Sequence, residues 1–232
     1  MTQKESNNLM EQRKEYPKNH LSSTSKMDGV KSWSLQALET YPGAYNKDGS
    51  LVPVCSACYA TSGYYHMPTV IKARSDNKEA WKNPKWVEIM IISLENERYF
   101  RWFDSGDMYA LALANKIYKI MQKTTWVRHW LPTKMYKFPK FHGILNKMKL
   151  LPNVSIRFSS DSIDGTYTYG LHGSVVIPSY DFKDENMFIC QAYLNGGKCG
   201  ACKACYDPSI SIVGYKGHGK PMEKLQRLLN NP

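Results

Sequence analysis

The sequence predicts an α/β protein built as a partial or irregular (β/α) barrel, with a cysteine-rich loop near its C-terminus. Short aromatic or β-branched segments alternate with longer segments whose apolar residues recur at helical spacing. This alternation favours a parallel sheet, because each crossover helix covers one face of the sheet. With 42% hydrophobic residues, the 232-residue chain can bury a large core, and we expect a single α/β metal-binding domain over residues 30–232.

The elements follow in chain order. Residues 1–29 are polar and lack apolar periodicity, which predicts a flexible N-terminal segment. Strands are expected within 30–38 and at 99–103, 126–131, 154–158, 174–177 and 211–213. Helices are expected at 68–82, from residue 84, and at 108–123, 137–149 and 221–229.

Four cysteines lie close together near the C-terminus. Cys190, Cys199, Cys202 and Cys205 form a C-x8-C-x2-C-x2-C pattern within a glycine-rich stretch. A consecutive CxxCxxC with a more distant fourth cysteine is typical of iron–sulfur ligation, so we expect these thiolates to hold a 4Fe-4S cluster. Zinc remains the alternative, because four thiolates also satisfy a tetrahedral structural site.

The remaining two cysteines, Cys55 and Cys58, form a CxxC motif. They are further candidate metal ligands that either replace a loop cysteine or pack as thiols nearby. Disulfides are disfavoured because the chain begins without a recognisable secretory leader. No apolar run approaches the ~18 residues of a membrane span, so we expect a soluble, cytoplasmic protein without membrane contact.

Polar residues follow three of the predicted strands. In parallel α/β folds, working residues collect where the carboxyl ends of strands meet. Capping of the next helix is the structural alternative for the two aspartates after the strand at 99–103. A histidine between two glycines near the C-terminus adds a general base, ligand or cluster neighbour. The candidate catalytic residues are Asp104, Asp107, Arg128, Arg157, Asp161 and His218, and the candidate cofactor-binding residues are Ser105 and Ser159.

The net charge of +11 suggests contact with an anionic partner such as nucleic acid or a phosphorylated ligand. The lysines are spread along the chain, however, and this distribution also fits an ordinary solvated surface.

Several segments together resemble the bacteriophage "gene product 88" family. They are Cys55-Ser56-Ala57-Cys58-Tyr59-Ala60, Asp104-Ser105-Gly106-Asp107-Met108, Trp130-Leu131-Pro132-Thr133-Lys134, the stretch from Leu151-Pro152-Asn153-Val154 to Ser159-Ser160-Asp161, and the terminal CxxCxxC. The resemblance covers residues 30–220. It implies a phage or prophage protein in an infected host cell, with a barrel resembling the radical S-adenosylmethionine core. The sequence departs from that superfamily's CxxxCxxC signature, because it offers only CxxC at the corresponding place.

These features lead to three functional hypotheses. The first is an iron–sulfur enzyme that acts on a small molecule by hydrolytic or Lewis-acid chemistry beside the polar residues. The second is a nucleic-acid-binding or host-interaction protein with a structural cluster or zinc. The third is a radical S-adenosylmethionine-like enzyme. A serine hydrolase of the usual α/β type is disfavoured, since the sequence contains no GxSxG elbow.

Overall fold

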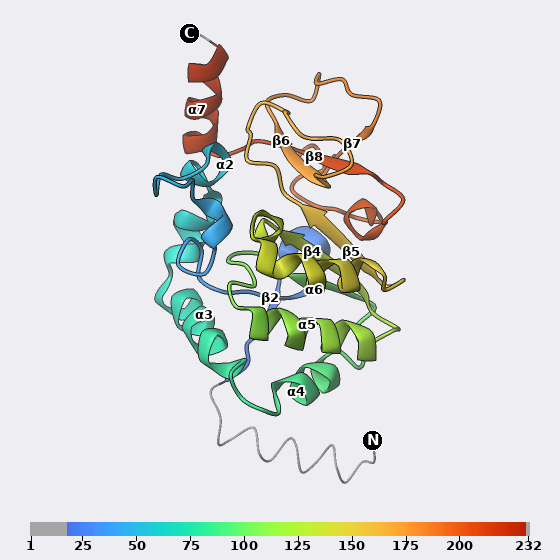
Figure 1. The fold of residues 1–232 in the computed structure, drawn as a ribbon. Helices are drawn as coiled ribbons and strands as arrows, with labels where there is room; N and C mark the ends of the chain where they lie inside the picture. The colour runs from blue at the N-terminus through green and yellow to red at the C-terminus, as the bar shows by residue number, and fades with distance from the viewer. Residues whose placement is uncertain (1–17, 231–232) are drawn as a thin grey trace.

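The computed structural model describes residues 18–230, without the side chains of residues 25, 229 and 230. Within this range the chain forms two β-sheets and six α-helices (Figure 1). The larger sheet has the order β1 (Ser22–Ser23), β2 (Lys31–Trp33), β3 (Tyr99–Trp102), β4 (Arg128–Thr133) and β5 (Val154–Phe158). All neighbours in it are parallel except β1 and β2.

The second sheet is smaller and wholly parallel. Its order is β6 (Ser174–Ile177), β8 (Ile212–Lys216) and β7 (Met187–Ile189). A parallel bridge between Ser159 and Ser174 joins it to the end of β5.

The predicted α/β class is confirmed, and the two sheets form no closed barrel in the described part of the chain. A (β/α) barrel needs a crossover helix after each strand. After β5 the chain instead continues through loops, and no α-helix separates β5 from β6, β6 from β7 or β7 from β8.

Helices cover one face of the larger sheet. They are α4 (Trp86–Ser93), α5 (Leu111–Lys123) and α6 (Pro139–Lys149), with α3 (Pro68–Ala80) at the side (Figure 1). Phe100 and Trp102 of β3 and Leu131 of β4 point to this face and join the main apolar core with the helices. Because side chains alternate along a strand, Arg101 and Trp130 point to the opposite face.

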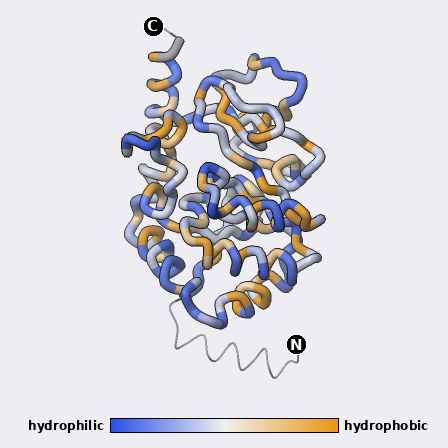
Figure 2. Tube along the Cα trace, viewed as in Figure 1, coloured by the Kyte–Doolittle hydropathy of each residue, from blue (hydrophilic) through white to orange (hydrophobic). Residues whose placement is uncertain are grey.

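Two further helices complete the described part of the chain. Helix α2 (Pro53–Ser56), which the sequence did not predict, carries Cys55. Helix α7 (Lys220–Asn230) ends the described range, and hydrophobic and hydrophilic residues alternate along it (Figure 2). Its buried Gln226 donates from Nε2 to the carbonyl of Ile163 at 2.8 Å.

The predicted N-terminal segment falls partly outside the described residues. Within residues 18–29, the side-chain oxygen of Asn19 accepts hydrogen bonds from the indoles of Trp33 and Trp86 at 2.8 and 2.9 Å. Met27 is buried. This part of the segment is therefore attached to the domain.

No helix among residues 18–230 is long and apolar enough to cross a membrane.

Candidate metal centre

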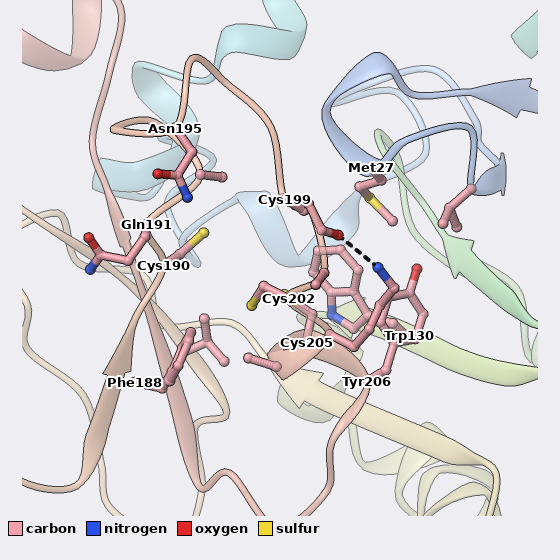
Figure 3. Close-up of a pocket in the computed structure, with 17 residues that line it drawn as sticks. Met27, Trp130, Phe188, Cys190, Gln191, Asn195, Cys199, Cys202, Cys205 and Tyr206 are labelled. Carbon is pink, nitrogen blue, oxygen red and sulfur yellow. Dashed lines mark hydrogen bonds between the residues drawn. The ribbon is translucent and has the colours of Figure 1, made fainter.

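The four loop cysteines surround one pocket of about 410 Å³ (Figure 3). The pocket lies where the loop meets both sheets, since Trp130 of β4 and Val213 of β8 also line it. The loop is fixed at two places: the Cys199 amide donates to the Lys26 carbonyl at 2.7 Å, and the Cys190 amide donates to Gly214 of β8 at 2.9 Å. Cys190, Cys199, Cys202 and Cys205 therefore lie at one pocket, and their role as metal ligands stays a prediction.

Tight turns bring these thiols together. The amide of Cys202 donates to the carbonyl of Cys199 at 3.1 Å, and the amide of Tyr206 donates to the carbonyl of Lys203 at 2.8 Å. Gly200, between the second and third cysteines, has a φ of 55°, a conformation that glycine adopts with little strain. Each two-residue gap thus turns the chain back toward the pocket.

Arg157 holds the base of the loop. Its side chain is 2% exposed, and all five of its N–H groups donate to backbone carbonyls. Nε donates to Cys205 at 3.0 Å, Nη1 to Gly173 and Ile210 at 3.2 and 3.0 Å, and Nη2 to Ala204 and Asp207 at 2.7 and 2.8 Å. With no donor left for a ligand, Arg157 positions the cysteine loop.

The surroundings of the thiols combine burial with positive charge. Burial raises the pKa of Cys199, while the Lys26 and Lys203 ammonium groups oppose this rise. Burial also raises the pKa of Cys205, while the hydrogen bond with the Tyr215 hydroxyl and the charges of Arg157 and Arg101 lower it. Without a metal the two groups are therefore thiols at neutral pH, and metal binding would displace their protons.

The four loop cysteines that line the pocket offer the soft thiolate ligands that iron–sulfur clusters and structural zinc both use. No group of three or more His, Cys, Asp or Glu residues within 18–230 is arranged to hold a metal ion.

Cys55 and Cys58 lie in a different environment. Cys55 is buried, and burial raises its pKa to about 12 against the opposing charge of Lys134. The amide of Val54 donates to the Asp161 carbonyl at 3.0 Å, which ties α2 to the end of β5. The electrostatic neighbours of Cys55 are Lys134, Cys58, Asp161 and Lys137, none of which belongs to the cysteine loop.

Asp107 and Asp161 flank Lys134, which directly follows β4. Asp107 comes after β3, and Asp161 comes after β5. Asp107 is fully buried and accepts from the Thr133 hydroxyl and the Lys134 amide, each at 2.9 Å; burial raises its pKa to about 7. Asp161 pairs with the ammonium groups of Lys134 and Lys137 at 2.8 and 2.5 Å. Lys134 is 1% exposed and also donates to the carbonyls of Ser159 and Ser160.

A separate polar group surrounds Asp104 and Ser105. The Asp104 carboxylate pairs with Arg101 at 2.8 Å and accepts from the Tyr65 hydroxyl. Ser105 accepts from Arg74 Nε at 2.5 Å and donates to the Leu35 carbonyl at 2.6 Å. Capping is excluded for both aspartates, because the next helix begins at Leu111 with Ala110 as its N-cap.

The remaining predicted residues occupy three different places. Arg128 lies exposed at the amino end of β4, where it donates to the Pro152 carbonyl at 3.1 Å, so the fold does not bring it to Asp104. The hydroxyl of Ser159 accepts from Ser174 at 3.2 Å. His218 stacks on Tyr59 and on Tyr193, with ring centroids 6.0 and 5.9 Å away. Because Tyr59 follows Cys58 and Tyr193 belongs to the loop, His218 connects the two cysteine regions.

Sequence reasoning missed the residues that surround these groups, notably Arg101, Lys134 and Tyr215. Strand alternation could have identified Arg101, since it lies between the core residues Phe100 and Trp102. Lys134 directly follows β4 and could have been included with the other strand-end residues. No sequence signal identifies Tyr215, whose hydroxyl lies 3.1 Å from the Cys205 sulfur.

The fold and the pocket define a mixed α/β protein with four cysteines around one pocket, on the sheet face opposite the helices. A family model described as Gene product 88 matches residues 4–224. The chain belongs to this bacteriophage gene product 88 family. No curated protein and no solved structure matches the chain.

Proposed function

We propose that the protein is an iron–sulfur protein whose 4Fe-4S cluster is held by Cys190, Cys199, Cys202 and Cys205. The observation that supports this most strongly is that all four cysteines line a single pocket. Soft thiolate ligands select iron–sulfur clusters, and the cations of Lys26, Lys203 and Arg157 offset the negative charge of the ligand set.

A cluster with four cysteine ligands supplies one-electron transfer or a structural cross-link, whereas Lewis-acid chemistry needs an iron without a thiolate. The contacts of Asp104 favour electron transfer or a structural cross-link over Lewis-acid chemistry. Asp104 does not line the pocket, and its carboxylate is already paired with Arg101 and Tyr65. The Arg101 guanidinium in turn lies over the ring of Trp130, which does line the pocket. We therefore propose an electron-transferring or structural cluster rather than a hydrolytic site.

Purification without oxygen, followed by iron, sulfide and zinc analysis, tests this proposal. The expected result is a brown protein with about four irons and about four sulfides per chain, whose visible absorption bleaches on reduction. One zinc per chain without sulfide would exclude the cluster and support a structural zinc site.

A further inference from the structure

The buried indole of Trp130 has a hydrogen-bond donor without a partner. Trp130 is 7% exposed, and its Nε1 donates to no protein atom in the described structure. Leaving a buried donor unpaired costs about 1–3 kcal/mol, so native proteins rarely do so. The same indole lines the cysteine pocket beside Cys202 and Cys205 (Figure 3). A group that occupies the pocket would supply the missing acceptor.

Packing fixes the indole in this position. The Arg101 guanidinium lies 4.6 Å from the centre of the Trp130 ring, and the Tyr206 ring meets it edge-on at 5.9 Å. The Tyr215 ring stacks on it at 6.5 Å with an interplanar angle of 22°. Trp130 is anchored by β4, where it pairs in register with Arg101 of β3. The N–H group therefore has little freedom to find a partner elsewhere.

Tyr215 places a second polar group at the same pocket. Its hydroxyl lies 3.1 Å from the Cys205 sulfur. Cys199 and Cys205 also pack against the apolar group formed by Met27, Trp130 and Tyr206. A metal-bound thiolate has no proton to give, so Tyr215 must then be the donor.

We propose that Trp130 Nε1–H and the Tyr215 hydroxyl donate hydrogen bonds to sulfur atoms of the metal centre and thereby raise its reduction potential. This inference rests on the proposed iron–sulfur function. The reduced centre carries one more negative charge than the oxidised one, so donors aimed at sulfur stabilise it more. Trp130 and Tyr215 therefore tune the reduction potential without being metal ligands.

Redox titration of Trp130→Phe and Tyr215→Phe, followed by visible absorption and electron paramagnetic resonance, tests the inference. Each variant should keep its iron and sulfide but shift the ratio of reduced to oxidised centre about tenfold toward oxidised at fixed potential, which corresponds to ~59 mV. Trp126→Phe is a matched control, because its indole donates to the Leu94 carbonyl at 3.1 Å. Tyr99→Phe, which removes a hydroxyl from a neighbour of Tyr206, is the second control.

Unchanged potentials in both variants, with iron and sulfide retained, would overturn the inference and leave the proposed cluster intact. Absence of iron from the wild-type protein would instead remove the proposed function and the inference with it. In case Trp130→Phe fails to fold, the wild-type protein labelled with 15N at the indoles provides an independent test. A 15N coupling to the reduced centre is expected in double-resonance spectra, and its absence would contradict the role of Trp130.

Discussion

At the scale of single residues, Arg157 is the side chain whose hydrogen bonds hold the cysteine loop. It supplies all five of its donors to carbonyls around the cysteine loop, so its loss leaves several buried acceptors unpaired. We predict that Arg157→Met lowers the free energy of unfolding by at least ~3 kcal/mol and reduces the iron content. Urea denaturation and iron analysis measure both effects.

Arg128→Met is the matched control, because Arg128 is exposed and makes one hydrogen bond to a carbonyl. Its unfolding free energy should change by no more than about 0.5 kcal/mol. Equal losses in the two variants would show that the Arg157 hydrogen bonds do not hold the loop.

His129 makes stability depend on pH. It is fully buried between Trp102 and Thr124, and burial lowers its pKa from 6.5 to about 3. A histidine with a lowered folded-state pKa contributes its full stability above pH 6.5 and loses it as the pH falls toward 3. We predict that melting temperature falls more steeply between about pH 6.5 and about pH 4 in the wild type than in His129→Gln.

Other acidic groups also titrate in this range, so the comparison between variants isolates His129. His142→Gln, which changes an exposed histidine, should keep the wild-type slope. A wild-type slope in His129→Gln would mean that this imidazole does not control the acid response.

At the scale of elements, the turn after β3 depends on Gly106. Its φ is 73°, and an added Cβ would lie 2.6 Å from the Thr40 hydroxyl and 2.7 Å from the Leu35 Cβ. Gly49 has a φ of 84° but open space around it. Gly106→Ala should therefore destabilise the protein by about 1–3 kcal/mol more than Gly49→Ala, as measured by urea denaturation. Similar losses would show that the close approach at Gly106 is accommodated by relaxation.

Element prediction from the sequence succeeded where local patterns are strong. Helix α5 carries Leu113, Ile117 and Ile120 at helical spacing, and all are buried as predicted. The sequence did not predict strand β7, because a strand of three residues is too short to show an alternation of apolar and polar side chains. Strand β2 ends at Trp33, earlier than predicted; the following Leu35 amide donates to the Ser105 carbonyl, a contact invisible in local sequence.

At the scale of the whole molecule, the cysteine loop and the main core are separate. The main apolar core contains residues of β3, β4 and the covering helices but none of the cysteines. We predict that removal of the proposed cluster exposes the loop at 190–210 to hydrogen exchange while strands β3 to β5 remain protected. Exchange measured by mass spectrometry before and after chelation tests this. Equal loss of protection throughout would show that the metal stabilises the entire fold.

The site was only partly predictable from the sequence. Cys190 to Cys205 are close in the chain, so their spacing alone indicated a common centre. The environments of Arg128 and Arg157 depend on which end of a strand each occupies and on long-range contacts with the loop. Spacing carries no information about such contacts, and both arginines were therefore assigned the same catalytic role.

Matched cysteine variants, each purified without oxygen and analysed for iron and sulfide, test the central claim most directly. We predict that Cys199→Ser and Cys202→Ser lose the visible iron–sulfur absorption, while Cys55→Ser and Cys58→Ser retain it, because the loop cysteines line the pocket and Cys55 lies beside Lys134. Loss of iron from Cys55→Ser and Cys58→Ser, together with retention in Cys190→Ser, would contradict the account and divide the ligands between the two cysteine regions.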